Sequence, residues 1–396
     1  MLHTPTIRVE LPVSCRVWII TSGTVLALGG DGIDMTLIRW RLATLLLIGC
    51  APAEKRDAPF IDVRPLTSLA IDSVDLLERV PAISSTGYIA AQLLAPPSGG
   101  VGVFDSHGRF VKRIAKAGGG PGELRGVDAA GFGSGDTLWI IDQSRALHAF
   151  APPPSLTYVR TVHAEHPISG QVTRFGFLSE ALVWGPNTQA LRFMPPMLLG
   201  WDGKESARFG AEEAVGDADA RMGAVYAIDS SQIWWARGNA YAVDRVTKNG
   251  AVTGRIARTV DWFPPGMMTT ALPWEARPRP RIRSITVDSA GRVWLLIRRA
   301  HRKWVADTTQ PPRRPGPIAI ASLRSLFDVS QYFETVIEVF DPSTGVLLAS
   351  STMSATIFGF AAPGILCEVG ETEDGRATIS LLSVSLQKVD RLAQRR

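Results

Sequence analysis

Four arginines alternate with other residues in one short proline-rich stretch: Arg277, Arg279, Arg281 and Arg283. The intervening prolines force an extended backbone, and in an extended chain every second side chain points to the same side. Guanidinium groups at that spacing repel one another unless anions or carboxylates lie between them. The stretch therefore predicts an anion site, for a phosphate, a uronic acid or an acidic peptide. The alternative is a solvated rim that nearby Glu and Asp side chains neutralise.

A second candidate is a glycine-rich stretch, residues 118–123, which reads Gly-Gly-Gly-Pro-Gly-Glu. A phosphate-binding loop would end in Gly-Lys-Ser/Thr and open a helix, and neither feature follows here. We interpret the stretch as a close crossing between two repeats, where glycine permits a positive φ. Its last residue, Glu123, is kept with the arginines as a candidate ligand-binding residue.

The sequence indicates no catalytic residue and no metal ligand. His163 and His166 have a carboxylate between them, but a metal site needs three or more converging ligands, and we expect these imidazoles in a solvated loop. Asp128, Asp229 and Asp288 are expected on strands nearest a central axis. Each adjoins a turn signal, where Asp commonly hydrogen-bonds its own backbone. We therefore predict no cofactor.

The elements that would position these residues form a repeat. Between residues 83 and 385, an apolar strand, a polar turn and two further strands recur six times. The second strands open on a large apolar residue, and the first five openings lie 51, 45, 50 and 60 residues apart: Tyr88, Trp139, Trp184, Trp234 and Trp294. This period is typical of four-stranded antiparallel sheets in a radial array. The sequence predicts an all-β fold, a six-bladed β-propeller.

The two ends of the repeat are expected to meet. The sixth repeat has only three clear strands, while a spare strand at residues 71–80 precedes the first repeat. We expect this N-terminal strand to complete the last blade, because an open array would leave unpaired edges. The propeller is then predicted over residues 70–390, with a long loop insertion at 300–335 in blade five and a C-terminal tail at 391–396.

Three stretches carry a resemblance to a known family: Val103 to Phe110 with the glycines that follow, Leu138 to Phe150, and Glu338 to Gly345. Together with the blade pattern, they resemble bacterial six-bladed β-propeller lipoproteins, distant relatives of NHL-repeat propellers. The resemblance implies a fold and no activity, because propellers host many functions. Propeller lyases and lactonases share this frame. A metal-dependent enzyme with an axial site, using calcium or zinc, is therefore the alternative function.

Residues 35–50 look like the signal peptide of a lipoprotein. A short segment with Arg39 and Arg41 precedes an apolar run too short to span a bilayer, which ends in Leu-Ile-Gly-Cys at Cys50. The pattern implies a signal peptide at 35–49, lipidation of Cys50 and a tether at 50–69. Residues 1–34 are interpreted as an upstream extension from a wrongly assigned start codon. We expect an exported protein, lipid-anchored in the cell envelope, in the outer membrane if the host has two membranes.

Composition narrows the classes of partner. The 396-residue chain carries a formal net charge of +5, with no basic stripe or module of the kind that binds nucleic acid. Rigid blades hold loops around one axis, so a site can be assembled without any single motif. We predict a monomeric, membrane-anchored, non-catalytic scaffold. Its expected partner is an envelope protein, an anionic small molecule or a glycan.

Overall fold

The chain divides into two compact units, Met1–Ala58 and Pro59–Arg396. In the first unit, β1 (Val17–Thr21) pairs with β2 (Thr24–Leu28) as an antiparallel hairpin. The predicted signal peptide and Cys50 lie outside the residues that the computed structural model describes. The described residues are 17–21, 24–28 and 59–388, except 70–79, 94–99, 115–117, 143, 167–169, 180–181, 185–190, 194, 211–223, 237, 239, 265–275, 307–331, 356 and 372–376.

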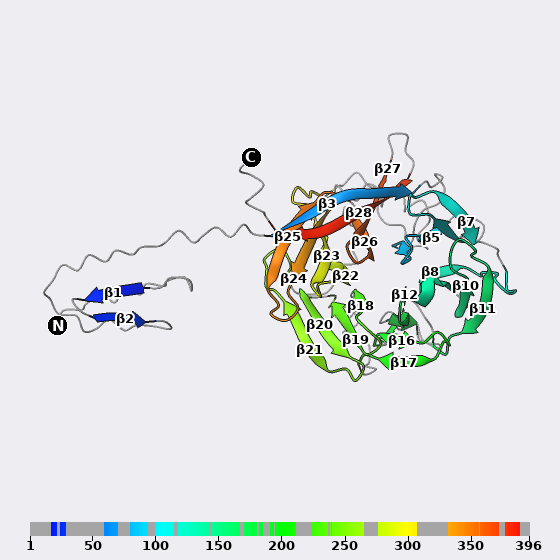
Figure 1. Ribbon diagram of the computed structural model, residues 1–396, viewed down its shortest axis with the longest axis horizontal. Coiled ribbons are helices and arrows are strands. Elements are labelled where there is room, and N and C mark those ends of the chain that lie inside the picture. The colour runs from blue at the N-terminus through cyan, green and yellow to red at the C-terminus, as the bar shows by residue number, and fades with distance from the viewer. Residues whose placement is uncertain are drawn as a thin grey trace. The chain divides into compact units, whose positions relative to one another are not determined.

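The second unit is a six-bladed β-propeller, in which six four-stranded antiparallel sheets surround one axis (Figure 1). Within each blade the strands are hydrogen-bonded neighbours from the axis outward. The strands of the first three blades are β4 (Ala82–Ile83), β5 (Ile89–Leu93), β6 (Gly100–Phe104) and β7 (Phe110–Ile114); β8 (Val127–Phe132), β9 (Leu138–Asp142), β10 (Ala146–Phe150) and β11 (Tyr158–His163); and β12 (Gly170–Thr173), β13 (Gly176–Ser179), β16 (Met197–Leu199) and β17 (Glu205–Arg208).

The last three blades follow the same order, and blade six takes its outermost strand from the start of the unit. Their strands are β18 (Val225–Ala227), β19 (Gln232–Ala236), β20 (Ala242–Thr247) and β21 (Val252–Ala257); β22 (Arg281–Val287), β23 (Val293–Ala300), β24 (Phe333–Phe340) and β25 (Leu347–Met353); and β26 (Ile357–Ala362), β27 (Ile365–Glu371), β28 (Ala377–Gln387) and β3 (Phe60–Leu69).

Buried apolar side chains of the described residues form six clusters, one at each interface between neighbouring blades. Three large residues of second strands illustrate the pattern. Trp139 packs between blades two and three, Trp234 between four and five, and Trp294 between five and six. A blade therefore buries both faces only when it has a neighbour on each side, which is why the array closes.

The closing strand lies upstream of the predicted one. β3, residues Phe60–Leu69, pairs antiparallel with β28, whereas the sequence predicted that residues 71–80 would do so. Part of the predicted tether is therefore a blade strand. A β-bulge leaves Leu66 without a paired position and 54% exposed. The bulge shifts the alternation of the strand, so Ile61 and Val63 pack toward blade five and Leu69 packs toward blade one.

Blade three also departs from the predicted repeat. The aromatic residue of its second strand is Phe177, not Trp184. Phe177 is fully buried, and its ring centroid lies 5.2 Å from those of Trp139 and Trp201. The strand begins at Gly176, which has φ +142 and where a Cβ would lie 2.0 Å from the carbonyl oxygen of Leu199. Only glycine allows that approach.

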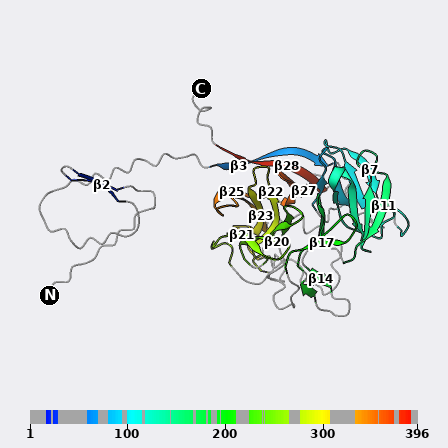
Figure 2. The ribbon, with the colours of Figure 1, turned by 60° about the horizontal axis from the view of Figure 1, so that its bottom comes forward.

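The residues predicted for that second strand form a separate hairpin. β14 (Leu182–Trp184) pairs with β15 (Leu191–Phe193), and Figure 2 shows this hairpin outside the ring of blades. In blade five, the predicted long insertion lies between the end of β23 and the start of β24. Most of it, residues 307–331, falls outside the described part of the chain.

A buried aspartate joins the first two blades. Asp136, in the turn between β8 and β9, accepts hydrogen bonds from the backbone N–H groups of Ser85 and Thr86 at 2.8 and 3.1 Å. It also accepts both of their hydroxyl groups, each at 2.8 Å. Burial acts to raise the pKa of Asp136, but these donors outweigh it and hold the pKa below its ordinary value.

Replacing Asp136 with Asn is expected to lower the free energy of unfolding by about 2–3 kcal/mol near pH 7, because charge-assisted hydrogen bonds are lost and a buried amide donor faces other donors. The depressed pKa means that the carboxylate stabilises the fold above the pKa of the unfolded chain, about 3.9, and loses this effect as pH falls through the lower folded-state pKa. Urea unfolding between pH 7 and pH 3 measures the difference.

The difference in the free energy of unfolding between the wild type and Asp136→Asn should shrink below about pH 4, because the wild-type carboxyl then becomes protonated and loses its charge. Asp202→Asn is the matched control, because Asp202 is exposed in a blade-three turn and accepts the Lys204 N–H at 3.2 Å. This control should change stability by less than about 0.5 kcal/mol. A deficit independent of pH would show that the ionised carboxylate is not what joins the blades.

Candidate functional site

One face of the ring carries the connections between blades. Strands alternate in direction within a blade, so the first strand begins and the second ends at the same face. We name this the crossover face, and its longest connections are residues 115–126, 180–196, 211–224, 258–280 and 301–332. The opposite face, the turn face, carries short turns such as residues 105–109 and 288–292. Long connections are where binding residues concentrate.

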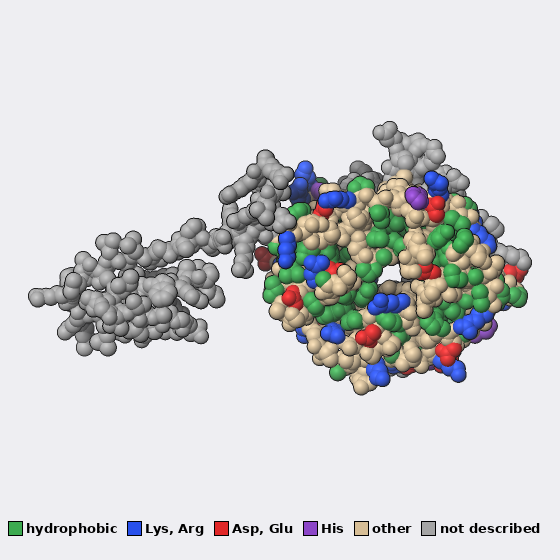
Figure 3. Space-filling view, in the orientation of Figure 1, with side chains coloured by type: hydrophobic (Ala, Val, Ile, Leu, Met, Phe, Trp, Pro, Cys, Tyr) green, Lys and Arg blue, Asp and Glu red, His purple; other side chains and the backbone are tan. Residues whose placement is uncertain are grey.

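The predicted arginine stretch reaches the axis at the crossover face. Arg277 and Arg279 are exposed on either side of the buried Pro278, as an extended backbone requires. Arg281 is the first residue of β22, the strand of blade five nearest the axis. The alternation stops at Arg283, where a β-bulge interrupts the pairing of β22 with β23. Figure 3 shows a hollow at the centre of the ring, bordered by hydrophobic, basic and acidic side chains.

A fifth arginine, Arg298, joins the stretch from the next strand. It lies directly opposite Arg281 in the β22–β23 pairing. Its guanidinium carbon lies 4.6 Å from the centre of the Phe333 ring, at the start of β24. Burial, and then the nearby charge of Arg281, lower the pKa of Arg298 to about 10. The Arg298–Arg299 doublet is visible in the sequence. The strand register that places Arg298 opposite Arg281 is not.

Two neighbouring arginines are neutralised by buried glutamates. Arg299 Nε donates to Glu334 Oε1 at 2.7 Å, and its guanidinium lies 4.7 Å from the centre of the Trp262 ring. Arg258 Nη1 donates to both carboxylate oxygens of Glu338, at 2.7 and 2.8 Å. Two arginines near this end of blade five, Arg258 and Arg299, are therefore held by ion pairs with buried carboxylates.

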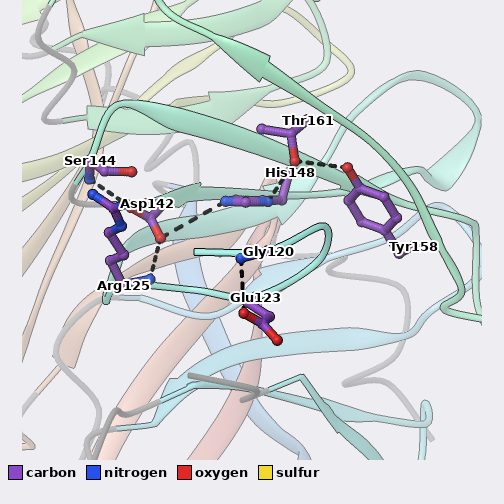
Figure 4. Close-up of polar contacts among 8 residues, drawn as sticks. All are labelled: Gly120, Glu123, Arg125, Asp142, Ser144, His148, Tyr158 and Thr161. Atoms are coloured by element: carbon purple, nitrogen blue, oxygen red, sulfur yellow. Dashed lines mark hydrogen bonds and ion pairs between the residues drawn. The ribbon is translucent and has the colours of Figure 1, made fainter. Parts of the chain in front are cut away.

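Glu123 lies on the crossover face but in another connection, between blades one and two. Its carboxylate accepts the N–H of Gly120 at 2.8 Å, and its own N–H donates to the Gly120 carbonyl at 3.0 Å (Figure 4). A Cβ on Gly118 would lie 2.0 Å from the Glu123 carboxylate. Glu123 therefore closes the glycine-rich stretch on itself, as expected for a close crossing.

The predicted histidine pair does not form part of a larger donor set. His166 Nε2 lies 3.3 Å from Glu205 Oε2, and the same carboxylate oxygen accepts Arg208 Nη2 at 2.5 Å. His163 ends β11 and is exposed. Within the described ranges, no three His, Cys, Asp or Glu side chains converge in a way that could hold a metal ion.

Two of the three axial aspartates shape turns instead. Asp229 accepts the Ser231 N–H at 2.7 Å, in the turn between β18 and β19. Asp288 accepts the Arg292 N–H at 2.9 Å and the Trp294 Nε1–H at 2.8 Å. Both carboxylates are at the turn face, away from the arginine stretch at residues 277–283. Asp128 lies on β8 and is half-buried.

A chain of polar groups in blade two, which runs from the buried Asp142 and His148 to the exposed Tyr158, was not predicted (Figure 4). Asp142 Oδ2 accepts the Arg125 N–H at 2.5 Å, which fixes the end of the glycine-rich connection. His148 Nδ1 lies 2.9 Å from the Thr161 hydroxyl, which lies 2.9 Å from the Tyr158 hydroxyl. His148 Nε2 is 3.9 Å from Asp142 Oδ2. Burial lowers the pKa of His148, so a neutral imidazole bridges the two outer strands.

Comparison with solved structures supports the fold. The chain matches no protein-family model and none of the curated proteins. It is similar to a member of the DUF4221 family from Bacteroides vulgatus, with a TM-score of 0.53 and 10% identity over 84% of this chain and 100% of that one. A likeness at this identity establishes the propeller fold and says nothing of a ligand.

Two further structures have lower similarity. One is a protein from Bacteroides fragilis whose assignment as exported is itself a prediction, with a TM-score of 0.48 and 10% identity over 83% of this chain and 96% of that one. The other is the WD40 β-propeller domain of Doa1, with a TM-score of 0.41 and 11% identity over 81% of this chain and 97% of that one. Separately, the described residues include no helix long and apolar enough to cross a membrane.

Proposed function

We propose that this propeller is an exported, lipid-anchored binding protein that presents an anion-binding surface on its crossover face and catalyses no reaction. The observation that carries the proposal is the gathering of five arginines at one end of blade five: Arg277, Arg279, Arg281, Arg283 and Arg298. They occur on the face that also carries the long connections between blades. Such a surface attracts acidic ligands over several ångströms and orients them.

The fold suits recognition because it holds these groups on rigid elements. Strands of neighbouring blades are tied to one another: Gln92 Nε2 of β5 donates to the Val127 carbonyl of β8 at 2.7 Å, and Gln171 Nε2 of β12 donates to the Val225 carbonyl of β18 at 3.1 Å. The Phe360 N–H donates to the Ser284 hydroxyl at 3.2 Å, which ties blade six to blade five. The backbone of β22, which carries Arg281, therefore needs little reordering when a ligand binds.

Export and anchoring rest on the sequence pattern before Cys50 and on the resemblance to propeller lipoproteins. Mass spectrometry of the membrane fraction tests them directly: a diacylglyceryl-modified N-terminal peptide beginning at Cys50 is expected. The variant Cys50→Ala should leave the protein unlipidated. A mature protein that retains residues 35–49 would contradict the proposed anchor without affecting the proposed binding surface.

Changing Arg279 and Arg281 to Ser is expected to weaken binding to acidic ligands by about 10-fold or more, because each guanidinium contributes a charge-assisted hydrogen bond. Retention on carboxylated, phosphorylated and sulfated resins between 50 and 300 mM NaCl measures this, and the wild type should elute earlier as salt rises. The matched control changes Arg109 and Arg174, two exposed arginines of the turn face. Equal retention of both double variants on every resin would reject the proposed surface.

A further inference from the structure

Asp142 holds two connections of the crossover face to one strand of blade two. It is the last residue of β9 and is buried. Its Oδ2 atom accepts the Arg125 N–H at 2.5 Å, and its Oδ1 atom accepts the Ser144 N–H at 2.6 Å. Within the glycine-rich connection, the Gly118 N–H donates to the Leu124 carbonyl at 3.2 Å. The bond from Arg125 to Asp142 therefore fixes this connection to the end of β9.

The imidazole beside Asp142 has a buried nitrogen without a hydrogen-bond partner. His148 lies on β10, 4% exposed, and among the described residues nothing bonds to its Nε2 atom. Nε2 lies 3.9 Å from Asp142 Oδ2, too far for a hydrogen bond, whereas Nδ1 lies 2.9 Å from the Thr161 hydroxyl (Figure 4). A neutral imidazole carries one N–H. Placing it on Nε2 keeps a lone pair from facing the carboxylate and lets Nδ1 accept the Thr161 hydroxyl.

Ionisable groups surround His148 on every side that packs against it. They are Asp142 on β9, Tyr158 and His163 on β11, Glu123 and Arg125 in the glycine-rich connection, and Lys112 on β7 of blade one. Burial has the largest effect and lowers the pKa of His148; the charge of Asp142 opposes this effect and that of His163 adds to it. The neutral imidazole therefore stabilises the fold above about pH 6.5, and this effect is lost as the pH falls toward the lower folded-state pKa.

We propose that the Asp142–His148 pair is a pH-sensitive switch, in which proton uptake by His148 draws the Asp142 carboxylate from the Arg125 N–H and frees the glycine-rich connection. A proton from water adds to Nδ1, and both ring nitrogens then donate. Nδ1–H donates to the Thr161 hydroxyl, which turns its own hydrogen toward Tyr158 at 2.9 Å. Nε2–H now carries charge and attracts Oδ2. Shortening their 3.9 Å separation to about 2.8 Å, the length of a charge-assisted bond, requires the carboxylate to move.

The switch acts on the face that carries the long connections between blades. Glu123, a candidate ligand-binding residue, belongs to the connection that Arg125 fixes. The same connection lies against the outer strand of blade two, since a Cβ on Gly122 would lie 3.1 Å from the Tyr158 ring. Proton uptake therefore changes the position of one part of the crossover face while the blades stay paired. The inference stands on contacts within blades one and two and is independent of the proposed arginine surface.

Hydrogen–deuterium exchange of the full-length protein tests the switch between about pH 8 and pH 5, the range in which histidine changes charge. Each peptide's rate is divided by its rate in the urea-unfolded protein at the same pH, which removes the intrinsic effect of pH on exchange. His148→Gln keeps a hydrogen-bonding amide and does not titrate. His107→Gln is the matched control at an exposed histidine of the turn face, and His163→Gln tests the second histidine near the site. A peptide from β24 reports separately on Glu338, whose pKa is about 7.

The relative exchange of residues 118–126 should rise about 10-fold or more on acidification in the wild type and in His107→Gln, because each unit of difference in pKa between two states shifts their ratio about 10-fold. In His148→Gln it should not change with pH. Exchange at the C2 position of the histidine rings gives the titration midpoint of His148 in the wild type, without any substitution. Opening of the glycine-rich connection should have the same midpoint.

Three results would overturn the inference. The first is a relative exchange of residues 118–126 that is the same at both ends of the pH range. The second is an equal rise in wild type and His148→Gln, which would assign the pH dependence to another group. The third is a rise that disappears in His163→Gln and persists in His148→Gln, which would make His163 the switch. If His148→Gln does not fold, agreement or disagreement between the two wild-type midpoints decides.

Discussion

Deleting residues 1–69 is expected to prevent the ring from closing, whereas deleting residues 1–58 should leave a folded propeller. The first deletion removes β3, nine of whose ten residues pair with β28. It also removes Leu69, 4% exposed, from the cluster between blades six and one. The expected loss exceeds about 5 kcal/mol, which is most of the stability of an ordinary domain. Near-ultraviolet circular dichroism and urea unfolding of the two truncated proteins measure it.

The structure explains why a short segment has so large an effect. β3 contacts both of its neighbours, since Ile61 and Val63 lie against blade five and Leu69 against blade one. The turn of blade one approaches the same strand closely: a Cβ on Gly108, which has φ +77, would lie 2.1 Å from the Ser68 carbonyl oxygen. Without β3, the edge of β28 and the outer side of two interfaces are exposed to water.

Two further variants separate loss of closure from general damage. Leu69→Ala in the chain that begins at residue 59 should cost about 2–4 kcal/mol by creating a cavity at the closing interface. Leu66→Ala, at the exposed bulge of the same strand, should cost less than about 0.5 kcal/mol. If the protein lacking residues 1–69 unfolds at the same urea concentration as the protein lacking 1–58, β3 is not the closure of the ring.

The blade repeat was predictable because it depends on local patterns. Turn residues such as Asp341 to Gly345, and apolar second strands such as that containing Trp234, follow the chemistry of hairpins wherever they occur. The closing strand was misplaced because Pro65 and the bulge at Leu66 interrupt its apolar alternation. Proline is tolerated there because β3 lies at the edge of its sheet. Trp184 was misassigned because an inserted hairpin carries a strand-like pattern of its own.

The candidate site was predictable only in part, because pairing between strands is not written in local sequence. Arg281 could be identified from its spacing with neighbouring arginines. Arg298 could not, since it faces Arg281 only through the β22–β23 register. The same limit applies to Asp142, the last residue of β9, and His148 on β10. Their side chains approach each other only because the two strands pair. Residues that act within one segment were visible, and residues that meet through tertiary pairing were not.

Replacing Glu338 with Ala is expected to lower the free energy of unfolding by about 3–5 kcal/mol, the cost of leaving a partly buried cation without its partner. Glu338 lies on β24, 2% exposed, and burial raises its pKa to about 7. Its carboxylate accepts the hydroxyl of Tyr241 and both contacts from Arg258. These donors come from blade four and the connection that follows it, so the network joins blades four and five. Urea unfolding at pH 7 measures the loss.

Comparing Glu338→Ala with a triple variant separates the contribution of the whole network to stability from the cost of leaving one charge without its partner. Changing Glu338 to Leu, Arg258 to Met and Tyr241 to Phe together removes the carboxylate, the guanidinium and the phenol hydroxyl while keeping similar volume, and such replacements are often neutral or stabilising. The triple variant should therefore recover stability to within about 1–2 kcal/mol of the wild type. If it remains as unstable as Glu338→Ala, the network itself holds the two blades together. A single variant that costs less than about 1 kcal/mol would instead show that water reaches Arg258 and replaces the carboxylate.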